Sequence, residues 1–590
     1  MKTNIYGPYT FIYNDDDEVT CESLEKFRTF QFKWNSDHCY VTVRWKIPVI
    51  NIRYCWYPEC KFNRELRPDW KEPVVSSIAT SAPVYCFLDM SGNNCFTVAL
   101  SEAISKINWS MGLHEETSEI NCEFSFCLRE TNGEKKSLLR IYTNKDNVSL
   151  PEVLKDVAQW WENECGYLPM PVPNAGKNPF YSTWYSMHQN VSADKIEEQC
   201  RIAKQLGMDT IIVDDGWQTD DNHRGYGYTG DWEVATDKFP DFRAHIDKVH
   251  ALGMKYMIWF SVPFVGFYSK SYEKFKTKLL KVLDNMQCGI LDPRYPEVRR
   301  YLVDVYRNAV IQWNLDGIKL DFIDSFVYGE DLHEPPYMEG MDFENVELAV
   351  IALLDDIKNA LLKIRPDLLI EFRQSYTGPA MRMYGNLFRV TDCPCDVLSN
   401  RVGMIDLRLL ANDSAIHSDM LEWNPEESTE SVVNQILNVI FAVPQISFDL
   451  TRLSRKHKEA LTFWLSVIRN NKDVLQYGKL AIEAPQNLYP LVMAQKEEKA
   501  IIAVYEDGHS ICLPKGCSEI IVLNATSKNR VIVAGGCDNY VGRTFLITCY
   551  DCYGQKIKCS YEKLNDLQYF EVPVSGMINM CIVADGVSRP

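Results

Sequence analysis

Three apolar stretches decide the fold: TIIVD at residues 210–214, KYMIWF at 255–260 and GIKLDF at 317–322. The first two are apolar on both faces, which is typical of strands in a parallel sheet that helices cover. Amphipathic helical patterns separate them. In residues 242–252, Phe242, Ile246, Val249 and Leu252 share one face, and Gly253 ends the pattern. The region therefore alternates strands and helices.

The same alternation continues on both sides of these stretches. About eight β/α steps fit into roughly 290 residues, which favours a closed (β/α)8 TIM barrel over an open sheet. Further strands are expected at residues 182–186, 368–372, 387–391, 415–417 and 445–448, and further helices at 192–206, 296–313, 344–365 and 455–471.

The two ends of the chain show a different pattern. Short alternating apolar runs broken by Gly, Asn and Asp predict an N-terminal β-sandwich at residues 1–165. A Pro-, Gly- and Asn-rich connection at 168–179 leads into the barrel, expected at residues 166–473. Similar runs predict a C-terminal antiparallel β domain, a second sandwich, at residues 474–590. The predicted fold class is thus α/β plus all-β, with a central barrel between two β domains.

Composition excludes some classes of function. With 62 Lys and Arg against 80 Asp and Glu, the formal net charge of the 590 residues is −18. Binding to nucleic acid or to an anionic membrane requires a basic surface, so neither is expected as a partner. The sequence shows no run of 18 apolar residues and no apolar stretch of secretory type at its start, which predicts a cytoplasmic protein.

Twenty cysteines raise the question of disulfides and metal. In a cytoplasmic protein the thiols are expected to be reduced. Two groups are candidate zinc ligands, Cys393 with Cys395, and Cys549 with Cys552 and Cys559, but neither has the second pair that a zinc site needs. We expect core cysteines, no metal and no cofactor, and we expect His188 and His417 to be supporting or core residues.

Charged and aromatic residues gather where the expected barrel strands end. Chemistry in this fold sits at the C-terminal strand ends. Several carboxylates with flat aromatic faces there suit glycoside hydrolysis, which uses one carboxylate as nucleophile and a second carboxyl as proton donor. The strand-end residues are Trp184, Asp214, Asp215, Trp259, Lys319, Asp321, Arg373, Asp392, Ser418 and Asp419.

Each of these residues also has a structural interpretation. An Asp after a strand is often a helix N-cap, but Gly216 and Trp217 follow Asp214 and Asp215 in place of a helical pattern. Lys319 and Asp321 share one strand face, as an ion pair that is either functional or structural. Asp392 precedes an X-Pro turn. The tryptophans, Trp217, Trp232 and Trp259, are as readily core residues as sugar platforms.

At these residues the chain resembles the α-galactosidases of glycoside hydrolase family 36. The likeness covers most of residues 65–470, and segments at 66–73 and 82–103 extend it into the N-terminal domain. It rests on four motifs: VDDGWQ (213–218), GDWEVATDKFPDF (230–242), HALGMKYMIWF (250–260) and DGIKLDF (316–322).

The resemblance implies roles for individual residues. Asp321 would be the nucleophile, and Asp392 the acid/base, with Asp396 as the alternative in FRVTDCPCD (388–396). Substrate contacts would come from Asp214, Asp215, Lys319, Trp259, Trp217, Arg373, Trp184 and Asp419. The chain departs from the family at EFRQSYTGPAMR (371–382), where Glu371, Arg373 and Gln374 stand in for the usual sugar determinants.

The sequence therefore predicts a retaining, exo-acting α-glycosidase, with α-galactosidase as the first choice. The expected partner is a small carbohydrate, and a homo-oligomer is left open. The alternatives are an α-glycosidase for another sugar, a transglycosylase, and a non-catalytic carbohydrate-binding protein. The intact Lys319-x-Asp321 pattern argues against the last of these.

Overall fold

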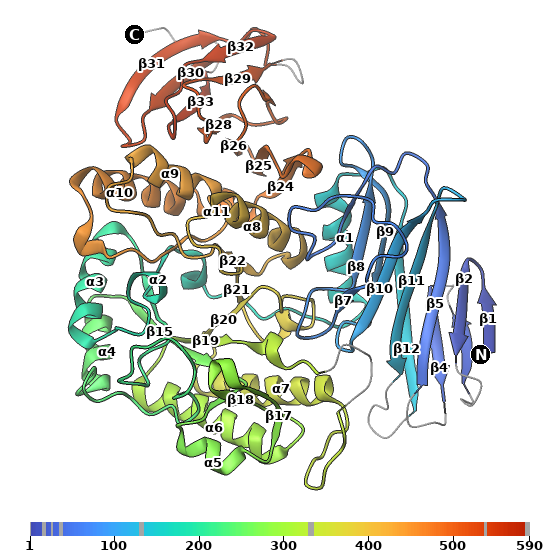
Figure 1. Cartoon of the computed structure of the whole chain (residues 1–590). Helices are drawn as coiled ribbons and strands as arrows, with labels where there is room; N and C mark the ends of the chain where they lie inside the picture. The colour runs from blue at the N-terminus through green and yellow to red at the C-terminus, as the bar shows by residue number, and fades with distance from the viewer. Residues whose placement is uncertain are drawn as a thin grey trace.

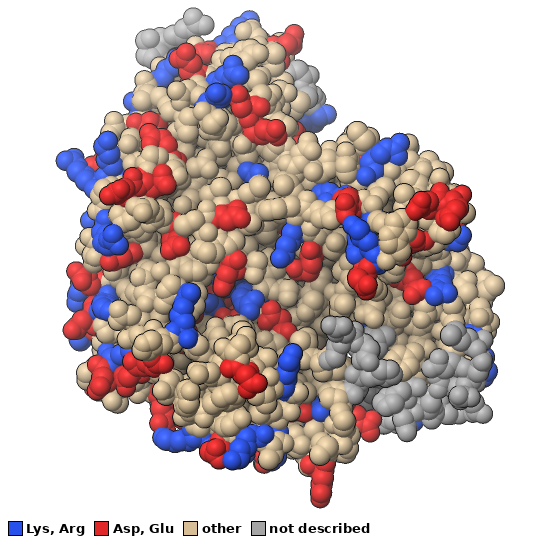
Figure 2. Space-filling view, viewed as in Figure 1, with Lys and Arg blue, Asp and Glu red and all other residues tan. Residues whose placement is uncertain are grey.

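A computed structural model describes residues 2–13, 19–24, 28–34, 39–128, 135–328, 335–535 and 540–583. A barrel occupies the centre, with one pair of β-sheets beside it and another at one end (Figure 1). On the face seen in Figure 2, Lys and Arg are interspersed with Asp and Glu, so neither sign of charge dominates that face.

Two six-stranded sheets form the N-terminal part, with Phe11, Phe30, Val41, Val98 and Phe124 in the core between them. Alternation builds this core, since every second side chain of the longest strands is buried. One sheet has the order β1 (Lys2–Tyr6), β2 (Tyr9–Tyr13), β5 (Cys39–Pro48), β11 (Glu119–Leu128), β10 (Ile107–His114) and β7 (Val74–Ser76). The other has the order β3 (Thr20–Leu24), β4 (Thr29–Lys33), β12 (Lys136–Asn144), β9 (Asn94–Leu100), β8 (Val84–Leu88) and β6 (Tyr54–Trp56).

Eight parallel strands form the barrel. The barrel closes at Val443, whose backbone bonds Ile416 and Ser418 and so joins the last two strands. In chain order the strands are β13 (Phe180–Ser182), β14 (Thr210–Val213), β15 (Lys255–Ser261), β19 (Gly317–Asp321), β20 (Leu369–Arg373), β21 (Leu387–Arg389), β22 (Ala415–His417) and β23 (Gln445–Ile446).

Helices cover the outside of the barrel and bury apolar side chains in the shared core. They are α3 (Ala193–Leu206), α4 (Phe242–Ala251), α6 (Pro296–Trp313), α7 (Val346–Ile364), α8 (Val397–Ala411), α9 (Thr429–Asn438) and α10 (Arg455–Asn470). Shorter helical elements are α2 (Trp184–Met187), α5 (Lys270–Phe275), α11 (Lys472–Tyr477), η2 (Asn174–Lys177), η3 (Asp284–Met286), η4 (Ile323–Ser325), η5 (Met381–Met383), η6 (Leu450–Arg452) and η7 (Pro485–Asn487). An insertion adds a small sheet of β16 (Phe264–Gly266), β17 (Leu279–Leu283) and β18 (Cys288–Leu291).

The C-terminal part also consists of two sheets, and two of its pairings, β26 with β28 and β27 with β29, are parallel. One sheet contains β24 (Lys479–Glu483), β25 (Leu491–Lys496), β26 (Lys499–Val504), β28 (Glu519–Asn524), β33 (Met577–Ile582), β30 (Thr544–Tyr550) and β31 (Lys556–Lys563). The other contains β27 (Ser510–Cys512), β29 (Val531–Ala534) and β32 (Leu567–Phe570).

Some local predictions were wrong. The strand expected at 182–186 ends at Ser182, and Trp184 begins a short helix. Three helices, α1 (Leu150–Asn163), α8 and α9, were not expected from the sequence. Helix α8 is buried on most of its circumference, so its apolar residues lack the one-sided stripe that reveals a surface helix.

Three pieces of the chain meet at one buried junction. Asp406 of α8 accepts hydrogen bonds from Trp56 and Arg64 of the N-terminal part and from Tyr489 of the C-terminal part. All four side chains are buried. This junction fixes both β regions to the barrel.

Candidate active site

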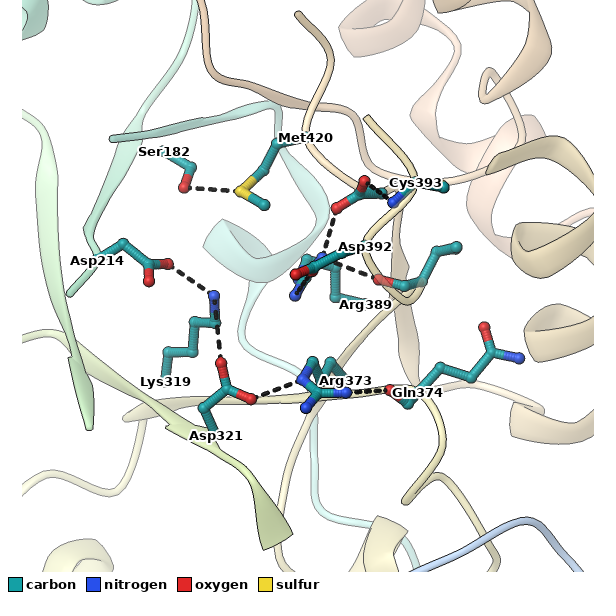
Figure 3. A network of polar contacts seen from close by, with 12 residues as sticks. Ser182, Asp214, Lys319, Asp321, Arg373, Gln374, Arg389, Asp392, Cys393 and Met420 are labelled. Atoms are coloured by element: carbon teal, nitrogen blue, oxygen red, sulfur yellow. Dashed lines mark hydrogen bonds and ion pairs between the residues drawn. The ribbon is translucent and has the colours of Figure 1, made fainter. Parts of the chain in front are cut away.

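Charged side chains from five of the barrel strands and the loops that follow them converge at the C-terminal ends of the strands. Figure 3 shows Asp214, Lys319, Asp321, Arg373, Arg389 and Asp392 around a common space. The parallel register brings them together, since Ser261 lies beside Asp321, and Lys319 beside Glu371. The sequence-predicted cluster is thus assembled in three dimensions.

Asp321 is held on both carboxylate oxygens. Oδ1 accepts from Arg373 Nε at 2.6 Å and from the Phe322 N–H at 2.8 Å, and Oδ2 accepts from Trp259 Nε1 at 3.0 Å. Burial alone would raise the pKa of Asp321, but the charges of Arg373 and Lys319 more than offset it and hold that pKa well below its usual range. Asp321 is therefore an oriented, ionised carboxylate.

Lys319 joins Asp321 to the DD motif of β14. Its Nζ donates to Asp214 Oδ2 at 2.6 Å and lies 3.9 Å from Asp321 Oδ2. Burial would lower the pKa of Lys319, but the Asp214 and Asp321 carboxylates raise it above its usual value. The lysine is a fixed cation between two carboxylates.

Asp215 is held separately from this ion pair. It accepts from Gln189 Nε2 at 2.8 Å and Gln218 Nε2 at 2.6 Å, and burial raises its pKa to about 6. Position 216 requires glycine, because its φ is +117° and an added Cβ would lie 2.4 Å from the Gln189 backbone. The turn after β14 therefore brings both aspartates to the barrel mouth.

Asp392 is the most open carboxylate of the group, with its side chain 53% exposed. Its Oδ1 accepts from Arg389 Nη2 at 2.9 Å. Burial raises the pKa of Asp392, but Arg389 and Lys319 outweigh this and lower it, while the charge of Asp321 acts in the raising direction. Its proton affinity therefore depends on the charge of Asp321.

Asp419 has a different environment from the one expected of a sugar ligand. Its side chain is fully buried, and it accepts from Arg389, from the Cys393 N–H at 2.6 Å and from Tyr185 Oη at 2.9 Å. These contacts fix the segment that carries Asp392. We therefore propose that Asp419 positions this loop.

The three tryptophans occupy different environments. Trp217 is fully buried among Trp232, Phe242 and Phe260, and its Nε1 donates to the Trp259 carbonyl. The expectation that it contacts substrate is corrected, because no face of the ring is open. Trp259 is also buried, and it orients Asp321. Trp184 is half-buried, with Arg224 over its ring and His188 against its edge.

The residues 371–374 divide between the barrel interior and its mouth. Glu371 is fully buried, accepts from Gln445 and lies 3.8 Å from His417 Nδ1, and burial raises its pKa to about 7. Glu371 therefore lies inside the barrel, beneath the mouth, where its carboxyl is 3.8 Å from Arg389 Nε. The Gln374 side chain is turned away from Asp321 (Figure 3).

Asp396, the alternative acid/base, has another role in the structure. Its carboxylate accepts from the Ser399 N–H at 2.9 Å and from Ser399 Oγ at 2.6 Å, and it caps α8. Because Ser399 already bonds both carboxylate oxygens of Asp396, Asp392 is the better candidate for the proton donor.

Sequence reasoning missed two charged residues of the site. Arg389 connects Asp392 to Asp419, and Asp324 shares Arg373 with Asp321. Arg389 ends β21 within the quoted FRVTD segment, so its strand-end position was a usable signal. Asp324 lies beyond the strand in η4, where sequence gives no indication of its direction.

Within the described ranges, no three His, Cys, Asp or Glu side chains are grouped so that they could hold a metal ion. The cysteines of those ranges, the two groups weighed above included, are free thiols. The described helices include none that is long and apolar enough to cross a membrane.

An eight-stranded parallel barrel with carboxylates and cations at its C-terminal strand ends defines a TIM-barrel protein with a polar, carboxylate-lined mouth. The chain belongs to the Melibiase family, whose model matches residues 175–478.

Curated relatives match segments of the chain. Alpha-galactosidase Mel36A of Lactobacillus acidophilus is 28% identical over 201 residues, which are 32% of this chain and 26% of the relative. Alpha-galactosidase 1 of Pediococcus pentosaceus is 24% identical over 347 residues, covering 55% of this chain and 45% of the relative. The chain thus spans less than half the length of these curated relatives in the matched segments.

Solved structures extend the likeness to the whole fold. The GH36 alpha-galactosidase AgaA from Geobacillus stearothermophilus superposes with a TM-score of 0.63 at 13% identity, covering 98% of this chain and 81% of that one. The alpha-galactosidase from Lactobacillus brevis gives 0.63 at 14% identity, covering 99% and 87%. The predicted three-part architecture is thereby confirmed.

Proposed function

We propose that this protein is a retaining, exo-acting α-galactosidase that removes terminal α-linked galactose from small oligosaccharides. The observation that carries the proposal is the state of Asp321, a buried carboxylate held ionised by Arg373 and Lys319 and fixed on both oxygens. Such a group suits a nucleophile. The family and the activity named for its relatives support the choice of sugar.

In the first step, Asp321 attacks the anomeric carbon and forms a glycosyl ester. The bond to the leaving oxygen breaks, and protonated Asp392 gives its proton to that oxygen. Both events cannot use the same carboxyl, because the nucleophile must be ionised while the acid must hold a proton. The environments of the two carboxyls support this division: Asp321 is buried and bonded on both oxygens, whereas Asp392 is half-exposed and is bonded to Arg389 on one oxygen.

In the second step, Asp392 acts as a base. While Asp321 is ionised, its negative charge raises the pKa of Asp392. Ester formation removes that charge, so the pKa of Asp392 falls once its proton has been transferred. A lower pKa keeps Asp392 ionised, as a base must be. Water activated by Asp392 then releases the sugar with its α configuration. Retention calls for carboxyl groups about 5–5.5 Å apart during reaction.

Asp214, Asp215 and Lys319 are proposed to bind the hydroxyls of the terminal sugar through charge-assisted hydrogen bonds. Trp184, which is half-buried, is proposed to cover one sugar face with the ring face opposite Arg224. Variants of AgaA have been solved with raffinose and with stachyose, and both sugars are reasonable first substrates here. A cytoplasmic location is part of the proposal, and fractionation of expressing cells tests it.

A panel of nitrophenyl α-glycosides tests the reaction and the sugar together. The α-galactoside is expected to be cleaved fastest, and proton NMR is expected to show α-galactose as the first product. Asp321→Asn is expected to abolish turnover, while the capping variant Asp396→Asn keeps it. A β anomer as first product, or normal turnover by Asp321→Asn, would overturn the mechanism. Added acceptor sugars reveal transglycosylation as new products.

A further inference from the structure

Helix α1 lies between the N-terminal sheets and the segment of α8 and β24 (Figure 1). Its apolar face, including Val153, Val157 and Trp161, is buried. The opposite face carries Asp156, Gln159 and Asn163, which are exposed. That polar face of α1 is not used by the proposed active site.

Two cavities border this face of α1. The first, of about 460 Å³, lies between α1 and β12 and is lined by Arg140, Tyr142 and Trp160 among others. The second, of about 510 Å³, lies between α1 and the segment from Gln476 to Leu480. Asp156 and Gln159 line both, so the two cavities adjoin along the helix. Each volume is in the range of small-ligand sites.

The first cavity has fixed aromatic faces. The rings of Tyr142 and Trp160 lie 5.5 Å apart at an interplanar angle of 47°, and both side chains are half-buried. Half-burial holds a ring in place and leaves part of its surface accessible. An apolar ring face beside polar groups matches the C–H face and hydroxyls of a sugar.

The charges of the cavity favour a neutral ligand. Arg28 and Arg140 are offset by Asp156 and Glu164 in the same lining. Arg140 Nη1 also donates to the Glu164 carbonyl at 2.9 Å, so one of its donors is occupied. An anion would meet two carboxylates there, whereas hydroxyl groups can bond both carboxylates and amides.

We propose that this groove along α1 is a second carbohydrate-binding site, which holds a neutral oligosaccharide away from the barrel mouth. Trp160 stacks on one sugar unit, Tyr142 borders that unit at an angle, and Gln159 and Asn163 bond its hydroxyls. The site goes beyond the proposed hydrolysis and has no part in bond cleavage.

Calorimetric titration of the full-length Asp321→Asn variant with raffinose tests the groove. Two binding events per chain are expected, one at the mouth and one at α1. Trp160→Ala is expected to weaken one event at least about tenfold, which corresponds to about 1.4 kcal/mol. Gln159→Ala with Asn163→Ala, both on the surface, should weaken the same event without risk to folding. Trp70→Ala, at an exposed tryptophan of the N-terminal part, is the matched control.

Two further measurements separate this site from the catalytic one. In the wild-type background, Trp160→Ala should leave cleavage of nitrophenyl α-galactoside unchanged. Galactose release by Asp321→Asn would count against the proposed mechanism and not against the groove. The groove proposal would be overturned if every binding event that is observed, one or two, survived the α1 variants, or if phosphate displaced raffinose from α1.

Discussion

Arg373 Nε donates to Asp321 Oδ1 over 2.6 Å, between neighbouring barrel strands β20 and β19. The same guanidinium lies 3.3 Å from Asp324 and is stacked near Phe322 and Tyr376. One arginine therefore serves two carboxylates of one strand end. Its position decides both the direction and the charge of Asp321.

Arg373→Gln is expected to lower kcat by about a hundredfold or more, a loss typical of removing one preorganised donor. The pKa of Asp321 should rise because the largest charge that lowers it is gone. The acid limb of the pH–rate profile should then move to higher pH. Arg300→Gln on the exposed face of α6 is the control. An unchanged acid limb would show that Arg373 does not set the ionisation of Asp321.

Asp392→Asn is expected to depend on the leaving group. Substrates with poor leaving groups need proton donation and should lose about 10²–10⁴ in rate, while dinitrophenyl galactoside should be largely spared in its first step. Added azide should then attack the glycosyl ester and give the α-galactosyl azide, identified by NMR. An equal loss of rate for substrates with poor and with good leaving groups would show that Asp392 is not the proton donor.

Lys319→Met is expected to leave Asp214 without its strongest partner in a buried position. Galactose binding should weaken, and the pKa of Asp321 should rise, since Lys319 also holds that carboxylate ionised. Inhibition by free galactose measures the binding effect apart from turnover. Lys363→Met, at an exposed lysine of α7, is the control. Unchanged galactose affinity would assign Lys319 a purely structural role.

Stability should rise as the pH falls through the mildly acidic range. Burial raises the pKa of Asp324 and Asp215 to about 6 and that of Glu371 to about 7. The folded state therefore binds more protons than the unfolded state between about pH 7 and pH 4, so this contribution is complete below about pH 4 and lost as the pH rises through 6 and 7.

The opposite sign applies to Asp316. Burial would raise its pKa, but His250, the Tyr256 N–H, Lys255 and Arg365 lower it to about 2, so its contribution is lost as the pH falls from about 4 through 2. Urea unfolding is thus expected to show a stability maximum near pH 4, where the first contribution is complete and the second begins to be lost. Glu371→Gln should flatten the change between pH 6 and 8, and Asp367→Asn on the surface should not. A slope unchanged by Glu371→Gln would contradict the assignment.

Tyr489→Phe tests the junction between the three parts of the chain. The tyrosine hydroxyl donates to buried Asp406, and its removal should cost about 1–3 kcal/mol of unfolding free energy. The KM for small galactosides should stay the same, because the junction lies outside the site. Tyr561→Phe, at an exposed tyrosine of β31, is the control. Equal stability of the two variants would show that the junction contributes little.

The sequence by itself determined the barrel and the carboxylates of its mouth. Strands such as β14 and β15 are apolar on both faces, and a parallel sheet places residues that follow such strands at one edge. For this reason Asp214, Lys319, Asp321 and Asp392 were found without coordinates. Helix α6 was predicted with its observed ends because one apolar stripe runs along its length.

Only the tertiary structure decided which charged groups meet and which aromatic faces stay open. Arg389 reaches Asp419 across thirty residues, and Trp217 is enclosed by rings from four other segments. Such contacts depend on side-chain direction and on packing between elements that are distant in the chain. Local periodicity records which face of a strand or helix is apolar, but it holds no information about the partner that covers that face.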